Sequence, residues 1–195
     1  MRDIRLASSS PRRQQILKDL GLDFVVSPPV KYKEKLNGLD PGVLVCHNAL
    51  GKAKEVAEQY KGSIIIGCDT IVIFNNEIFG KPLTPDNANV MLMKLSGNYH
   101  SVFSGLAVID MQRNRELVGY DKTEVKFKDV SEKEINDYVE SGEPLDKAGA
   151  YGIQESGRVF VESVKGSFSN VVGLPKELLI KFLAELEIQV SQDSY

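Results

Sequence analysis

The sequence has few of the residues that mark several classes of protein. Its 195 residues include no tryptophan, two histidines and two cysteines, Cys46 and Cys68. The cysteines lie far apart and form no Cys-x-x-Cys pair, so neither a zinc site nor a disulfide framework is supported, and reduced thiols are expected. The apolar runs are also short. None approaches the roughly 20 residues of a membrane-spanning helix.

The balance of charge is slightly acidic. Twenty-four Lys and Arg residues against 27 Asp and Glu residues give a formal net charge of −3 at pH 7. This excludes a protein that coats nucleic acid through a large positive charge. Residues 1–5 alternate charged and apolar side chains, and they lack the apolar core of a secretory signal. We therefore expect a cytoplasmic protein that has neither nucleic acid nor a membrane as its partner.

Hydrophobic periodicity predicts an α/β protein. A first helix is predicted from Pro11, with Ser10 as its N-cap. Further helices are predicted after Asp40, Thr84 and Ser131. A last helix is predicted from Pro175. Strands are predicted at 4–7, 24–27, 63–74, 101–109, 116–127 and 159–164, with 101–109 and 116–127 antiparallel and half solvated. We expect one domain over residues 1–190, in two lobes, and a C-terminal tail at 191–195.

A carboxylate lies inside the apolar run 63–74. Asp69 stands two residues after Gly67 in this predicted strand. An ionised carboxylate among apolar side chains is costly unless it is paired, hydrated or bound to a metal. One interpretation is that the strand frays at Gly67, and that Asp69 caps a loop or pairs with a lysine. The other is that a rigid strand presents a general base or metal ligand beside a glycine that permits close approach.

The junction between the first strand and the first helix carries three serines, a proline and two arginines, at residues 8–13. Backbone N–H groups at the helix start, the serine hydroxyls and the guanidiniums of Arg12 and Arg13 could converge on a phosphate. The alternative is a plain Ser-Pro helix cap with two solvated arginines. No G-x-x-x-x-G-K-[ST] or G-x-G-x-x-G run occurs, so neither a P-loop nor a Rossmann site is supported.

The segment 143–154 is rich in both glycine and charge. It contains Asp146 and Lys147 and ends at Gln154, whose amide can both donate to and accept from a base edge. A glycine-rich turn with exposed charges is the alternative. Lys81, between Gly80 and Pro82, is a further candidate phosphate contact.

Hydrolase motifs of the serine type are absent from the sequence. There is no G-x-S-x-G run, and His47 and His100 stand in no recognised triad spacing. Both histidines are interpreted as structural. A serine hydrolase that uses the cluster at residues 8–10 therefore lacks a credible histidine.

Several motifs, in order and spread over residues 4–186, together resemble the Maf family of nucleoside triphosphate pyrophosphatases. They are Leu6 to Arg13, Gly67 to Thr70, Gly80 to Pro82, Leu95 to Gly97 with His100, Glu143 to Gln154, and Val172 to Pro175. The resemblance implies an elongated two-lobed fold on a twisted mixed β-sheet flanked by helices, similar to inosine triphosphatase, with a central cleft. The family often occurs as a dimer, which leaves a homodimer open.

The resemblance also favours one branch of the family. The branch that acts on dTTP and UTP has an arginine after Ser-Pro, a threonine after the catalytic aspartate and a Gly-Ala-Tyr-Gly-Ile-Gln run. Arg12, Thr70 and residues 149–154 match these three features. The branch that acts on 7-methyl-GTP resembles Ser-Pro-Trp-Arg, Asp-Gln and a Gly-Ser-Phe loop, none of which this sequence carries.

Carried over residue by residue, the resemblance implies roles for individual side chains. Asp69 is the implied proton acceptor, and Arg12, Thr70 and Gln154 set the base preference. Glu34 and Asp69 are the implied ligands of a divalent cation, Mg²⁺ or Mn²⁺. The predicted phosphate contacts are Ser8, Ser10, Arg12, Arg13, Lys52, Lys81 and Lys147.

The predicted reaction is hydrolysis of dTTP, UTP and modified pyrimidine nucleotides between the α and β phosphates. It gives the monophosphate and pyrophosphate, with Asp69 deprotonating a water for in-line attack. The alternative is a nucleotide-binding regulator of cell division or septum formation that needs no turnover.

Overall fold

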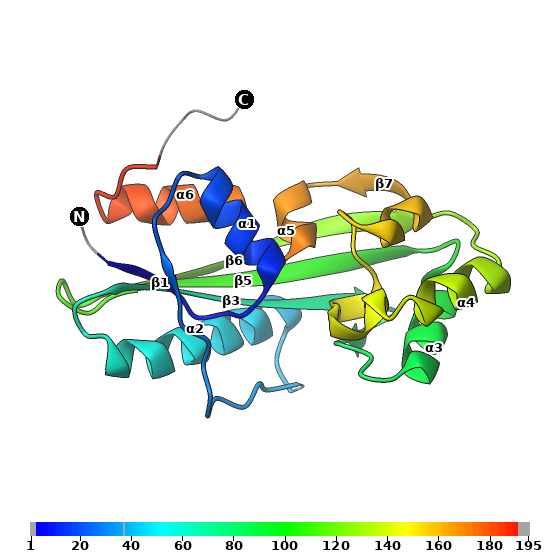
Figure 1. Ribbon diagram of the computed structural model, residues 1–195, viewed down its shortest axis with the longest axis horizontal. Coiled ribbons are helices and arrows are strands. Elements are labelled where there is room, and N and C mark those ends of the chain that lie inside the picture. The colour runs from blue at the N-terminus through cyan, green and yellow to red at the C-terminus, as the bar shows by residue number, and fades with distance from the viewer. Residues whose placement is uncertain (1–2, 37, 191–195) are drawn as a thin grey trace. The chain divides into compact units, whose positions relative to one another are not determined.

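The computed structural model describes residues 3–36 and 38–190 (Figure 1). The tail predicted at 191–195 lies outside the described residues. The helices are α1 (Pro11–Asp19), α2 (Pro41–Gln59), α3 (Pro85–Leu95), α4 (Glu132–Glu140), α5 (Phe168–Val172) and α6 (Lys176–Glu185), with short 3₁₀ helices η1 (Glu143–Asp146), η2 (Ala148–Ala150) and η3 (Ser156–Phe160). The strands are β1 (Ile4–Leu6), β2 (Val25–Val26), β3 (Ile64–Phe74), β4 (Glu77–Phe79), β5 (Tyr99–Asp110), β6 (Arg115–Phe127) and β7 (Val161–Lys165).

The seven strands of the described chain form one mixed sheet, in the order β2-β1-β3-β5-β6-β7, with β4 paired to β3. Strand β1 is parallel to both β2 and β3, whereas β4 is antiparallel to β3 and β7 is antiparallel to β6. The α/β class predicted from the sequence is therefore confirmed. None of the helices within residues 3–36 and 38–190 has the length and apolarity needed to span a bilayer.

Contacts group the chain into two compact units. The first contains described residues of Met1–Asp69, Ser104–Asp121 and Gly173–Tyr195, and the second contains Thr70–Phe103 and Lys122–Val172. In the first unit, α2 covers one face of the sheet, and α1 and α6 cover the other (Figure 1). Within β3 the division falls between Asp69 and Thr70.

Helix α2 packs unusually close to the sheet. A Cβ atom at Gly67 of β3 would collide with the carbonyl oxygen of Ala49, and one at Gly105 of β5 would collide with the carbonyl of Val45. Glycine at these two positions lets the helix backbone approach the strands directly. Ala49 and Ala53 are wholly buried in the resulting core. This close contact fixes the helix that carries Asn48 and Lys52 of the candidate site.

The structure corrects three local predictions. The strand predicted at 159–164 begins at Val161, because residues 156–160 form the 3₁₀ helix η3 with Val159 exposed. The Ser- and Asn-rich stretch after it contains the short helix α5, which was not predicted. Strand β5 is not half solvated: residues 104–110 are all buried, since β5 is an interior strand between β3 and β6.

Candidate functional site

The buried carboxylate of Asp69 is held by two side chains of α2. Strand β3 runs without interruption through Asp69, which is 4% exposed. The ammonium of Lys52, itself 8% exposed, lies 2.6 Å from Oδ1, and the Asn48 amide donates to Oδ2 at 2.9 Å. The strand therefore does not fray, and the compensation that the sequence demanded is an ion pair with a lysine plus one amide donor.

The ammonium of Lys52 lies between two carboxylates. Its Nζ atom is 2.5 Å from Oε1 of Glu34 and also donates to the carbonyl of Cys68 at 3.4 Å. The side chain of Glu34 is 45% exposed, in contrast to the buried Asp69. Arg13 donates to the same Cys68 carbonyl, so two cations and two carboxylates meet here, and the cluster is open to solvent through Glu34.

The segment that carries Glu34 is fastened to α2 upstream of that residue. The carboxylate of Glu55 accepts hydrogen bonds from the backbone N–H groups of Val30, Lys31 and Tyr32. These bonds lower the pKa of Glu55. The ring of Tyr32 fills the space where Gly51 has no side chain, and burial, with the charges of Asp69 and Glu34, raises the pKa of its phenol.

The serine and arginine junction is tied to the same strand. Arg13 Nε donates to the carbonyl of Gly173 at 2.8 Å, and its Nη1 donates to Ser8 Oγ at 3.0 Å and to the carbonyl of Cys68 at 3.2 Å. Ser8 is buried, and its Oγ also accepts from the backbone N–H of Ser10 at 3.3 Å. These bonds hold the start of α1 at residue 68 of β3. Arg12 and Ser10 lie partly exposed beside it.

Of the predicted residues, the first unit brings together Ser8, Arg13, Glu34, Lys52 and Asp69 through these contacts. Thr70, Lys81, Lys147 and Gln154 belong to the second unit. There Thr70 is partly exposed, and Lys81 and Gln154 are exposed.

Lys147 is the buried lysine of the second unit's loop. Its Nζ lies 2.6 Å from the carbonyl of Glu143, 2.9 Å from Asp146 Oδ1 and 3.0 Å from Glu155 Oε2. Its charge is thus balanced inside its own loop, while its contact with a phosphate stays a prediction.

Asn48, Glu55 and Tyr32 were not predicted. A signal for two of them is present in the sequence, because Asn48, Lys52 and Glu55 stand at i, i+4 and i+7. This spacing places three polar residues on one face of a helix, beside a face of alanine and valine. Tyr32 carries no comparable local signal.

The donor set is compatible with a hard divalent cation. Within residues 3–36 and 38–190, no three His, Cys, Asp or Glu side chains form a cluster that could hold a metal alone. Glu34 and Asp69 supply two carboxylates on either side of one ammonium. Mg²⁺ is commonly held by one or two carboxylates together with waters and substrate phosphates, so these residues fit that ion when a triphosphate completes its shell.

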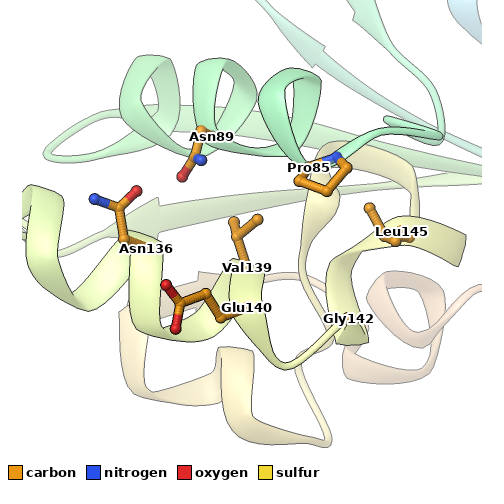
Figure 2. Close-up of a pocket in the computed structure, with 7 residues that line it drawn as sticks. All are labelled: Pro85, Asn89, Asn136, Val139, Glu140, Gly142 and Leu145. Atoms are coloured by element: carbon orange, nitrogen blue, oxygen red, sulfur yellow. The ribbon is translucent and has the colours of Figure 1, made fainter.

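A cavity of about 370 Å³ opens in the second unit between α3 and α4 (Figure 2). Asn89 of α3 faces Asn136 and Val139 of α4 across it. The predicted catalytic, specificity, phosphate and metal residues are absent from its lining, which consists of Pro85, Asn89, Asn136, Val139, Glu140, Gly142 and Leu145.

Comparison with known proteins gives one consistent result. The family described as Maf-like protein matches residues 3–186. A protein of Dictyoglomus thermophilum named dTTP/UTP pyrophosphatase is 46% identical over 95% of this chain and 96% of its own length. A protein of Methanosarcina mazei with the same name is 41% identical over the whole of both chains. The solved HAM1 protein of Coxiella burnetii has the same fold, with a TM-score of 0.55 at 18% identity, covering 95% of this chain and all of that one.

Proposed function

The chain belongs to the Maf family, and on this premise we propose that it is a nucleoside triphosphate pyrophosphatase that hydrolyses dTTP and UTP. The products are the nucleoside monophosphate and pyrophosphate. Relatives named for this activity are 40–46% identical over most of the chain. The observation that carries the proposal is the carboxylate of Asp69, almost wholly buried yet held by Lys52 and Asn48. A carboxylate fixed in this way is suited to orient a water and take its proton.

Asp69 acts as the general base. Each of its oxygens accepts one bond from α2, and a carboxylate offers about four lone-pair positions, so a water can be accepted as well. The water attacks the α phosphorus in line with the departing pyrophosphate, and its proton passes to the carboxylate. Lys52 keeps the carboxylate in place and adds positive charge beside the reacting phosphate.

Phosphate binding rests on the start of α1 and on lysines. Ser10 and Arg12 lie at the N-terminus of α1, where backbone N–H groups and the helix dipole favour an anion. Ser8, Arg13, Lys81 and Lys147 complete the proposed contacts. Glu34 and Asp69 would hold Mg²⁺ or Mn²⁺, which when bound neutralises charge on the phosphate oxygens.

The base preference is proposed to come from Arg12, Thr70 and Gln154. Polar groups that pair with a pyrimidine edge reject a purine, because the wrong base leaves them unpaired. We further propose a single Maf-like domain over residues 1–190, in two lobes, located in the cytoplasm. A homodimer and the use of modified pyrimidine nucleotides are part of the same proposal.

The test is pyrophosphate release from a panel of the eight common nucleoside triphosphates, with Mg²⁺ and with Mn²⁺. We expect dTTP and UTP to be preferred over the purine nucleotides. Asp69→Asn should lower turnover by about 10²- to 10⁴-fold while nucleotide binding stays measurable. The matched control is Asp110→Asn, because Asp110 is also buried in the first unit but caps the backbone of Arg113.

Three outcomes would contradict the proposal. Unchanged turnover in Asp69→Asn would remove this residue from the mechanism. Equal rates on all eight nucleotides would refute the proposed base preference. Nucleotide binding without any pyrophosphate release would instead favour a nucleotide-binding regulator.

A further inference from the structure

We propose that Asn48 is a positioning residue that locks the carboxylate of Asp69 and the segment carrying Glu34 into one unit. The inference rests on the proposed function, since it concerns the proposed base and the second carboxylate of the same site. In this proposal Asn48 contacts neither the phosphate nor the attacking water, but it donates to Oδ2 of the carboxylate that serves as the base. It acts through Asp69 and through the backbone of Lys35.

All hydrogen-bonding positions of the Asn48 amide are occupied. Its Nδ2 donates to Asp69 Oδ2 and to the carbonyl of Lys35, both at 2.9 Å. Its Oδ1 accepts from the backbone N–H of Lys35 at 2.9 Å and from the hydroxyl of Tyr32 at 3.2 Å. An amide offers two donors and two acceptor positions, so each is used once. The side chain is 1% exposed.

This pattern fixes which way the amide faces. A carboxylate can only accept hydrogen bonds, and the N–H of Lys35 can only donate, so the nitrogen faces Asp69 and the oxygen faces the N–H. Asparagine satisfies all four partners at once. Aspartate lacks both donors, and leucine lacks all four groups. The residue type at position 48 is therefore set by its partners on β3 and in the segment 32–35.

Asn48 joins Asp69 to the backbone that follows Glu34, whereas Lys52 joins Asp69 to the side chain of Glu34. Glu55 holds the backbone at residues 30–32, upstream of Glu34, while Asn48 holds the peptide groups of Lys35 immediately after it. Lys52, which lies between Asn48 and Glu55 on α2, contacts both Glu34 and Asp69. With the backbone held on both sides of residue 34 and Oδ2 of Asp69 held by the same amide, the backbone that carries Glu34 keeps a fixed position relative to the carboxylate of Asp69. Such fixed geometry contributes to the rate of the chemical step more than to binding.

Steady-state kinetics with dTTP test the role of Asn48. In Asn48→Leu we expect kcat to fall by about 10- to 100-fold while KM changes less than about threefold, because misplacement of the base affects the chemical step. Asn48→Asp should lower kcat at least as far, since a second carboxylate then faces Oδ2 of Asp69. An unchanged kcat in both variants would overturn the proposal.

Limited trypsin digestion tests the same hydrogen bonds between Asn48 and the segment 32–35 without an activity measurement. Lys31, Lys33 and Lys35 are exposed cleavage sites within the tied segment. Cleavage there should become about tenfold faster or more in Asn48→Leu, because the loss of these hydrogen bonds raises the population of the open segment. In the double variant Asn48→Asp/Asp69→Asn, the amide at position 69 can donate to the carboxylate at position 48. Part of the protection against trypsin should therefore return relative to Asn48→Asp alone.

The control is Asp110→Leu, which removes another buried polar side chain of the first unit. Because Asp110 caps residue 113, this variant should speed cleavage at Arg113 and Arg115 but leave the 31–35 sites and kcat within about threefold of the wild type. Equal acceleration at both sets of sites in Asn48→Leu would indicate general loosening and overturn the tie. If the wild type releases no pyrophosphate, the proposed function fails, whereas selective cleavage at 31–35 still supports the tie.

Discussion

Replacement of Lys52 by methionine tests the buried ion pair directly. Methionine keeps much of the length of the side chain but removes the ammonium that lies 2.6 Å from Asp69. Removing one partner of a buried pair typically costs about 3–5 kcal/mol, because the other charge stays buried without compensation. Asn48 still donates to Asp69, and the Glu34 side chain is 45% exposed, so we expect the lower end, about 3 kcal/mol.

A loss of this size is readily measured. For a chain of this length, 1 kcal/mol corresponds to roughly 2–4 °C, so the midpoint of thermal unfolding should fall by about 6–12 °C. Urea unfolding followed by circular dichroism gives the free energy of unfolding itself. In the double variant Lys52→Met/Asp69→Asn the cost should be at least about 1 kcal/mol smaller than the sum of the two single costs.

The control for this experiment lies two residues further along α2. Lys54 pairs with Glu116 at 3.0 Å, but both side chains are about half exposed, so Lys54→Met should cost less than about 1 kcal/mol. If Lys52→Met is no more destabilising than Lys54→Met, the pair at Asp69 is hydrated. Burial would then add nothing to the strength of this ion pair.

Further predictions concern other parts of the chain. Burial lowers the pKa of His100 to about 4 from 6.5, so His100 is protonated in the unfolded chain before it is protonated in the folded protein as pH falls. Up to about 3 kcal/mol of folding stability should therefore be lost between about pH 6.5 and 4. In urea unfolding, His100→Phe should show a smaller loss over that range. Ser131→Ala removes the half of the α4 capping box in which the serine hydroxyl accepts from the backbone N–H of Glu134, and it should cost about 1 kcal/mol by thermal unfolding. Gly67→Ala should cost about 1–3 kcal/mol, because its Cβ meets the backbone of α2; an unchanged melting temperature would show that the helix can shift freely.

Helix starts were predictable because their signals are local. Asp40 accepts from the backbone N–H of Gly42, Thr84 accepts from that of Asn87, and Ser131 forms its capping box with Glu134. Each of these contacts spans two or three residues. Short-range contacts are therefore where sequence patterns are most informative.

The partners of buried charges could not be predicted in the same way. The sequence showed that Asp69 needs compensation, but Lys52 and Asn48 are 17 and 21 residues away. Several lysines could have met that need, and only the packing of α2 against β3 selects one. The same holds for Lys147, whose contact with Glu155 depends on how the loop closes.

Helix α2 connects the core of the first unit to the candidate site. Its core positions 49, 53 and 56 each follow a site position, 48, 52 and 55, by one residue, and successive residues of a helix are about 100° apart. One face therefore packs against the glycines of β3 and β5 while the adjacent face presents the site. Because both faces belong to one rigid helix, the packing at Gly67 also sets the distance from Lys52 to Asp69, two residues further along the same strand. The precision of the site thus depends on the glycine and alanine contacts beneath it.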